Sequence, residues 1–303
     1  MNTAVVTDSS CDLASTTLEA LEVLAVPLGV RFGAHELRDG RESTAVDCIG
    51  RMRDTGEVPW LRPPDPDDFA AAYALALAGH ATVVSVHASS RLSETLTHAQ
   101  EGAKRAGVAD RVRFVDGLAA GSALAEQVRA AARAAAAGRA ADEVAGAAQR
   151  VRDATVTLLA PFDLGWLRKG RRMGTLQAAA SRVAARRPLW ELRAGDLVSV
   201  ASVPSDRRVD RMVRILERRL GEAPVRVVIG IAAEDPDAAE AAKARLAAGT
   251  LRIAEGRIQR IGAFLCARLG PGALTLTAYP ERALVAPPDA SAPPPPGGRA
   301  TGP

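Results

Sequence analysis

Short β-rich runs alternate with longer amphipathic segments along this chain, and this alternation constrains the fold more than any other feature of the sequence. In the first half, residue types that favour strands occur at 4–7, 24–32, 82–86 and 112–115. Helical segments are expected at 46–54, 67–78, 93–106, 118–137 and 142–151. Because this order is typical of β–α units on a parallel sheet, we predict a first α/β domain over residues 1–155.

The second half continues the alternation after a strand-like run at 155–159 and a loop rich in glycine and arginine. We expect strands at 189–192, 197–203, 225–231, 258–261 and 274–279, and helices at 176–185, 205–220 and 236–247. In the segment 205–220 the apolar residues recur at helical spacing, with Arg and Glu between them. These elements predict a second α/β domain over residues 156–285, with a ligand cleft between the two domains.

Length and composition limit the class of protein. A chain of 303 residues suits two domains of ~150 residues each. No run approaches the roughly 18 uninterrupted apolar residues of a membrane span, so we expect no stable membrane insertion. From residue 286 onward the chain is rich in proline and glycine and cannot bury a core, and we expect 286–303 to be a disordered tail.

The amino terminus and the cysteines favour a cytoplasmic protein. The chain begins without the basic segment, apolar stretch and small-residue cleavage site of an export signal. Its three cysteines, Cys11, Cys48 and Cys266, are widely spaced and form no CxxC pair, so neither a disulfide framework nor a metal site is indicated.

The positive charge does not indicate a nucleic-acid-binding protein. The net charge is +4, but only three of the 39 basic residues are lysines, and this arginine excess beside abundant Ala and Gly is typical of a composition bias. Aromatic residues make up 3% of the chain, too few for platforms that stack bases. We therefore expect no nucleic acid among the partners.

The sequence also lacks the motifs of several enzyme classes. It has no GxxxxGK[ST], no GxGxxG after a strand, no HExxH and no GxSxG. It therefore offers no signal for ATP binding, dinucleotide binding, zinc hydrolysis or a nucleophile elbow. We expect no cofactor and no catalytic residues.

Polar residues cluster in the segment 85–99, which runs from the end of a buried strand across a turn into a helix. If Ser90 lies near the N-cap, the free N–H groups of the first turn and the hydroxyls of Ser93 and Thr95 face the crevice at the end of the strand. That arrangement would suit an anion. The alternative is that Ser89, Ser90 and Ser93 only cap the helix, and their spacing does not decide between the two.

Five short blocks, in this order, resemble signatures of the DegV family. They are VTDSSCDL (6–13), VPLGV (26–30), SSRLSET (89–95), LRKGRRM (167–173) and GPGAL (270–274). The third block is similar to the family's SS-x-LSGT signature, with Glu94 in place of the usual glycine. The resemblance covers roughly residues 4 to 279.

The resemblance implies a fold of two α/β domains that buries a long-chain fatty acid at or near their interface. It assigns Ser93 to hold the carboxylate, and Arg172 to the loop beside the ligand head group. It further implies a carrier without catalytic activity of its own, which presents the carboxyl group to a separate, ATP-binding fatty acid kinase for acyl phosphate formation.

Besides Glu94, three further positions depart from the family pattern. Leu61 aligns with a threonine that helps to hold the carboxylate in the family, so one hydroxyl is lost. Arg268 takes the place of a histidine found two residues before GPG in many members. An arginine can grip an oxyanion but cannot shuttle a proton near neutral pH. Arg171 replaces the second glycine of the basic loop.

Two other hypotheses stay open. One, which the lost threonine and histidine motivate, is a DegV-fold protein that no longer binds fatty acid and acts as a sensor or binds another lipid. The other is an esterase or acyltransferase in which His87 serves Ser89 or Ser93 as a base, although a buried structural role for His87 is the simpler interpretation. Likewise, Asp8, Ser9 and Ser10 either cap the next helix or form the floor of a pocket.

Overall fold

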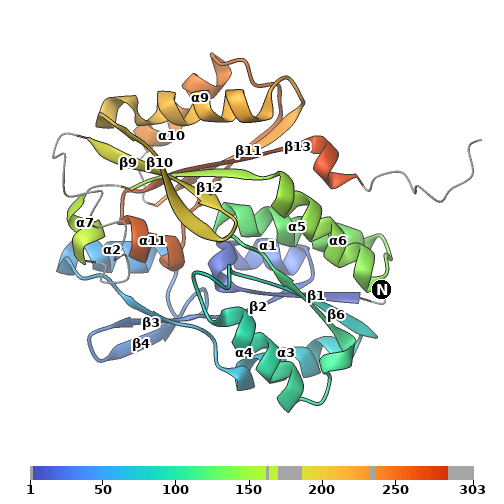
Figure 1. Cartoon of the computed structure of the whole chain (residues 1–303). Coiled ribbons are helices and arrows are strands. Elements are labelled where there is room, and N and C mark those ends of the chain that lie inside the picture. Colours follow the sequence, from blue (N-terminus) through green and yellow to red (C-terminus); the bar gives the residue numbers. More distant parts are fainter. Residues whose placement is uncertain (1–2, 162–163, 170–185, 233–235, 286–303) are drawn as a thin grey trace, which may run out of the picture.

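The computed structural model describes residues 3–161, 164–169, 186–232 and 236–285. The chain forms two sheet-containing units, joined between α6 and β8 (Figure 1). The expected helix at 176–185, the tail 286–303 and Arg172 lie outside the described residues. The predicted domain boundaries, after residues 155 and 285, stay predictions.

The first unit is built on a parallel sheet. Its strands lie in the order β2-β1-β6-β7, and all neighbouring pairs are parallel. They are β1 (Thr3–Asp8), β2 (Val23–Val26), β6 (Thr82–His87) and β7 (Val112–Asp116). The helices of this unit are α1 (Ser15–Ala20), α2 (Ala45–Thr55), α3 (Pro66–Leu77), α4 (Thr95–Arg105), α5 (Ser122–Ala136) and α6 (Ala141–Ala154), with short 3-10 turns η1 (Ser9–Cys11) and η2 (Ala109–Arg111).

A small antiparallel sheet stands beside the parallel one, in the order β4-β3-β5. It contains β3 (Gly29–Phe32), β4 (His35–Arg38) and β5 (Trp60–Arg62). The prediction of one strand over 24–32 was wrong, because the segment divides into β2 and β3 in different sheets. Pro27 stands at the division, and a proline cannot donate the hydrogen bond that a continuous strand requires.

The second unit contains a six-stranded sheet in the order β10-β9-β8-β13-β11-β12. Its neighbours run antiparallel except for the parallel pair β11 and β12. The strands are β8 (Val156–Ala160), β9 (Arg187–Arg193), β10 (Asp196–Val203), β11 (Val225–Ile231), β12 (Ile253–Arg260) and β13 (Leu274–Pro280), and the helices are α7 (Leu164–Lys169), α9 (Arg208–Leu220), α10 (Pro236–Ala247) and α11 (Ala263–Leu269), with η3 (Ser205–Arg207) and η4 (Glu281–Leu284).

The elements stack in layers (Figure 1). Helices α3 and α4 cover one face of the parallel sheet, and α5 and α6 fill the space between the two sheets. Helices α9 and α10 cover the far face of the six-stranded sheet. In α9 the buried side chains are Met212, Val213, Ile215 and Leu216, which confirms the amphipathic helix predicted for this segment.

One apolar cluster crosses the junction between the two units. It joins Met52 of α2 and Leu61 of β5 to Phe264 and Leu269 of α11, and it includes Trp190 of β9. Leu92, in the turn before α4, packs against the same cluster. The turn that carries Ser93 therefore lies against apolar side chains from both units. The predicted α/β fold is confirmed.

Candidate ligand-binding site

The carboxyl ends of β1 and β6 meet at the point where the strand order of the parallel sheet reverses. Ligands of open α/β sheets commonly bind at such a point, because the loops that follow the two strands diverge there. Here those loops are residues 9–14 after β1 and residues 88–94 after β6. The candidate site is built on these two loops and on α11, which approaches them from the second unit.

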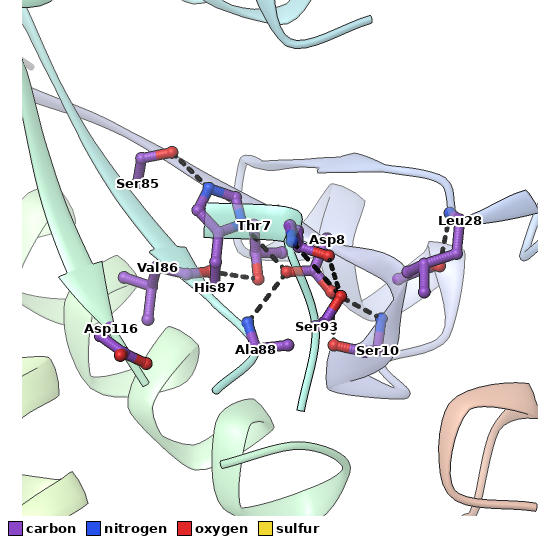
Figure 2. Close-up of polar contacts among 12 residues, drawn as sticks. Thr7, Asp8, Ser10, Leu28, Ser85, Val86, His87, Ala88, Ser93 and Asp116 are labelled. Atoms are coloured by element: carbon purple, nitrogen blue, oxygen red, sulfur yellow. Dashed lines mark hydrogen bonds and ion pairs between the residues drawn. The ribbon is translucent and has the colours of Figure 1, made fainter. Parts of the chain in front are cut away.

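A chain of buried polar side chains ties the two strand ends together (Figure 2). His87 and Asp8 are both fully buried, and Nδ1 of His87 lies 2.9 Å from Oδ2 of Asp8. The other ring nitrogen, Nε2, lies 2.6 Å from Oγ of Ser85, which in turn lies 2.8 Å from the hydroxyl of Tyr73. The backbone N–H of Ala88 also donates to Asp8, at 3.1 Å.

The environment of Asp8 favours its charged form. Burial alone would raise the pKa of this carboxyl, but the interactions with His87, Ser10 and Ala88 hold the pKa below its ordinary value. Asp8 also caps η1, because its side chain accepts from the N–H of Ser10 at 3.0 Å. The capping interpretation of Asp8 is therefore confirmed, and the same carboxylate fixes the start of the turn after β6.

The turn over residues 88–94 is held by hydrogen bonds to both units. The backbone N–H of Ser89 donates to the carbonyl of Ala119 at 2.8 Å. The hydroxyl of Ser89 donates to the carbonyl of Gly195, in the second unit, also at 2.8 Å. The hydroxyl of Ser90 donates to Asp116 at 2.5 Å. His87 contacts Ser85 and Asp8, and the hydroxyl of Ser89 donates to Gly195. A serine hydrolase would need a Ser89–His87 or Ser93–His87 hydrogen bond, and neither is present among the described residues.

Ser93 lies at the end of this turn, just before α4. Its side chain is partly buried, and its hydroxyl lies 2.7 Å from that of Thr95. The N-cap of α4 is Glu94, not Ser90 as the sequence suggested, and Glu94 makes no side-chain cap. The two hydroxyls therefore form a pair beside the first turn of α4, where N–H groups lack helical partners.

Arg268 approaches the same turn from the second unit. Its guanidinium stacks on the ring of Phe264 at 3.7 Å and donates from Nη1 to the Phe264 carbonyl at 2.7 Å. From Nη2 it donates to the carbonyl of Leu92 at 3.0 Å. The structure thus brings Arg268 to the residue that precedes Ser93, across 176 positions of sequence.

Leu61 is an apolar residue of the junction between the two units. It lies in β5, pairs in register with Val30 and is 5% exposed within the cluster that crosses the junction. At this position the chain offers an apolar wall and no hydroxyl. Of the four residues predicted for the site, Ser93, Leu61 and Arg268 converge on the junction, and Arg172 lies outside the described residues.

Trp166, which was not among the residues predicted from the sequence, links two of the family-like blocks. A side chain built at Gly270 would come within 2.9 Å of Trp166, so the GPGAL turn packs closely on this indole. Lys169 lies over the same ring at 5.0 Å and donates to the carbonyl of Gly56 at 2.8 Å. A tryptophan directly before a basic loop, in a chain with few aromatics, was the signal that could have found it.

The site shows no provision for a metal ion. Within the described ranges, no group of three or more His, Cys, Asp or Glu side chains is placed to bind one. Cys11, Cys48 and Cys266 are all buried and unpaired. The described part of the chain also contains no helix with the length and apolar character needed to cross a membrane.

Comparison with known families decides the identity of the fold. Residues 2–281 match the family model described as an uncharacterised protein of the DegV family. The chain belongs to the DegV family. A DegV domain-containing protein of Streptomyces coelicolor is 32% identical over 273 residues, which are 89% of this chain and 96% of that relative. A DegV domain-containing protein of Mycobacterium tuberculosis is 32% identical over 280 residues, which are 90% and 96% of the two chains.

Solved structures of DegV proteins share the whole architecture. One from Thermus thermophilus, described for its fatty acid binding, has a TM-score of 0.84 and 26% identity, and the match covers 92% of this chain and 100% of that one. DegV from Bacillus subtilis, described as a fatty acid binding protein, has a TM-score of 0.81 and 21% identity, covering 93% and 100%. At that lower identity the likeness shows the fold alone.

Proposed function

We propose that this DegV-family chain binds a long-chain fatty acid at the junction of its two units and holds the carboxylate at the Ser93–Thr95 hydroxyl pair. One observation carries the proposal. The hydroxyl pair stands at the strand ends of the parallel sheet, one residue from Leu92, which packs against the apolar cluster that both units share. The carboxylate and the acyl chain of a fatty acid would therefore contact adjacent polar and apolar surfaces.

The energetics favour this division of roles. Burial of an acyl chain yields ~0.8 kcal/mol per CH₂, so about fourteen methylenes supply of order 11 kcal/mol before association costs of several kcal/mol. A carboxylate at the same junction needs charge-assisted hydrogen bonds of roughly 1.5–3 kcal/mol each to offset its desolvation. The chain therefore supplies affinity, and Ser93, Thr95 and the guanidinium of Arg268 set the orientation.

The supporting relative is the Thermus thermophilus protein, whose fold matches over nearly the whole of both chains. The test is denaturing extraction of the purified protein followed by lipid mass spectrometry. We expect a stoichiometric C14–C18 fatty acid in the wild type and a depleted content in Ser93→Ala. A wild type that is empty and takes up no added fatty acid would contradict the proposal.

We further propose that the bound acid is presented to a separate fatty acid kinase, as the resemblance to the family implies. The test is reconstitution with a fatty acid kinase, ATP and radiolabelled palmitate, with acyl phosphate as the readout. Arg268 in place of histidine gives the site a fixed positive charge that would bind the acyl phosphate product as well as the carboxylate. Acyl phosphate formation that requires this chain supports the coupling.

A second candidate is a lipid-binding sensor without a kinase. Two observations favour it: Leu61 offers no hydroxyl, and the Arg268 guanidinium is already engaged with two backbone carbonyls. The same reconstitution separates the candidates, because a sensor would retain palmitate and yield no acyl phosphate. In both candidate functions the chain is a binding protein and not an enzyme.

A further inference from the structure

A furrow at the junction of the two units lies apart from Ser93, Leu61 and Arg268. Its inner part is a cavity of about 440 Å³ between the loop after β7, the end of α6 and strand β9. A neighbouring cavity of about 480 Å³ extends it past α9 and η4. Asp153, Ala154, Val156 and Arg219 line both cavities, so the two form one continuous surface, which we call the interdomain furrow.

The interdomain furrow is strongly basic. Its described lining contains five arginines against two carboxylates. Each of the two cavities has a volume within the roughly 300–1,000 Å³ that is usual for small-molecule sites. The five are Arg150, Arg152, Arg193, Arg219 and Arg282. The two carboxylates are Asp153 and Glu191.

Two of the guanidiniums are held together by one buried carboxylate. Arg193 and Arg219 both approach Oε2 of Glu191, at 2.5 and 3.4 Å. The Glu191 side chain is 7% exposed, whereas those of Arg193 and Arg219 are 46% and 49% exposed. Glu191 thus neutralises one of two positive charges and orders both guanidiniums, and the surplus charge faces outward where a ligand can reach it.

On the inner wall of the furrow, one buried hydrogen-bond acceptor has no donor. Gln127 is fully buried, and its Nε2 donates to the carbonyl of Gly117 at 2.9 Å, which fixes the orientation of the amide. Its Oε1 has no partner. Buried acceptors in folded proteins nearly always have a donor, so this oxygen calls for an O–H or N–H group from outside the chain.

A second orphan group lies in the outer part. Nε of Arg150 is buried without a partner, although the side chain as a whole is only partly buried. The furrow therefore combines a surplus of guanidinium donors with one buried acceptor. A phosphate monoester fits this combination best, since arginine pairs bind its oxygens through paired N–H bonds and its dianion balances more charge than a carboxylate would.

We infer that the interdomain furrow binds a small phosphate monoester that also carries a hydroxyl or amino group, with the phosphate between Arg193 and Arg219 and the donor on Gln127 Oε1. The inference is independent of the proposed fatty acid site. The two can fail separately, because the residues that would bind the phosphate monoester do not include Ser93, Leu61 or Arg268.

Isothermal titration calorimetry of the full chain tests the inference, with glycerol 2-phosphate as the probe and glycerol as the uncharged comparison at fixed ionic strength. We expect saturable binding of glycerol 2-phosphate and none of glycerol. Arg219→Gln should weaken binding ~10-fold, the loss expected for a hydrogen-bonded charge pair. The matched control is Arg218→Gln, an exposed arginine of the same helix outside the furrow, which should change binding less than ~2-fold.

Gln127→Met separates the two halves of the proposed site. It keeps the shape of the side chain and removes the acceptor, so it should weaken glycerol 2-phosphate ~5-fold and leave inorganic phosphate unchanged. The fatty acid content of Arg219→Gln should equal that of the wild type. Absence of saturable binding, an equal loss in Arg218→Gln, or equal effects of Gln127→Met on both phosphates would each overturn the inference.

Discussion

The guanidinium of Arg268 donates to the carbonyl oxygen of Leu92 at 3.0 Å and so joins α11 of the second unit to the turn that carries Ser93. This bond places a permanent positive charge one residue from the proposed carboxylate site. It also makes the position of the turn depend on how the two units pack.

Arg268→Ala should therefore weaken both the junction and ligand retention. The change removes hydrogen bonds to two carbonyls, each worth roughly 0.5–1.5 kcal/mol, so we expect the free energy of unfolding to fall by about 1–3 kcal/mol. Urea denaturation measures the loss, and lipid mass spectrometry should show less retained fatty acid. Arg41→Ala, at an exposed position, serves as the control and should alter neither value. Full retention of fatty acid in Arg268→Ala would remove Arg268 from the site.

Leu61→Thr restores the hydroxyl that the family pattern has at this position. In the protein without ligand, the change removes buried apolar atoms and places a hydroxyl in an apolar cluster, so we expect the free energy of unfolding to fall by about 2–4 kcal/mol. If this hydroxyl reaches the carboxylate, added palmitate should raise the melting temperature more in Leu61→Thr than in the wild type.

Thermal unfolding with and without palmitate measures both effects. Leu75→Thr provides the comparison, because Leu75 is 66% exposed on α3 and should tolerate the change at a cost below about 1 kcal/mol. An equal palmitate response in Leu61→Thr and the wild type would show that position 61 does not face the carboxylate.

Most strands of the parallel and the six-stranded sheets were predictable because their residues form short, continuous apolar runs, whereas β4 and β5 of the small antiparallel sheet were not predicted. Strands β1, β6, β11 and β13 are buried along most of their length, and each overlaps a run that the sequence analysis identified. The division of 24–32 into two strands was signalled by Pro27, but a single sequence does not reveal that β3 leaves the parallel sheet to pair with β5.

The contacts that build the site were not predictable, because they join distant segments. Asp8 and His87 are 79 residues apart, and Arg268 and Leu92 are 176 apart, and no local periodicity encodes such pairs. Helix α11 was missed for another reason: its seven residues are mostly apolar, and so short an apolar run does not distinguish a helix from a strand.

Asp39 should destabilise the protein at neutral and higher pH. It is 7% exposed, and burial, with the nearby charge of Asp8, raises the pKa of its carboxyl from 3.8 to about 6 despite a hydrogen bond from Ser9. Because the folded-state pKa is raised, the charged form is disfavoured in the folded protein. Stability is therefore lost as the pH rises from the ordinary value of the group through about 6.

Asp39→Asn should thus stabilise the protein by about 2–3 kcal/mol at pH 8 and by about 1 kcal/mol at pH 4.5, given ~1.4 kcal/mol per pKa unit. Urea denaturation at the two pH values measures the difference. Asp142→Asn, at an exposed carboxylate, should show no such dependence. A gain that is equal at both pH values would mean that Asp39 titrates normally.

Asp8 should behave in the opposite way. The pKa of its carboxyl is held below the ordinary value, so its stabilising contribution is present above that value and is lost as the pH falls through the folded-state pKa. Asp8→Asn breaks a buried pair with His87, and an amide cannot satisfy all the donors that face this position. We expect the free energy of unfolding to fall by about 3–5 kcal/mol at pH 7. The difference between Asp8→Asn and the wild type should become smaller at acid pH, as measured by urea denaturation. A loss that persists unchanged below pH 4 would contradict the assigned charge of Asp8.

Two glycines inside helices make a matched test of packing. Gly50 lies in α2, and a side chain built there meets no atom within 4 Å. Gly102 lies in α4, where the same added carbon would come within 2.4 Å of the Pro66 carbonyl oxygen and 2.6 Å of Phe69. Both substitutions gain the same helix propensity, since Gly costs ~0.5–1 kcal/mol relative to Ala in a helix interior.

Gly50→Ala should therefore raise the free energy of unfolding by about 0.5–1 kcal/mol. Gly102→Ala should lower it by about 1–3 kcal/mol, because α4 must move away from α3 to accept the methyl group. That movement would shift the first turn of α4, so Gly102→Ala should also lose bound fatty acid while Gly50→Ala retains it. If both variants gain stability, α3 and α4 do not pack as closely as the structure shows.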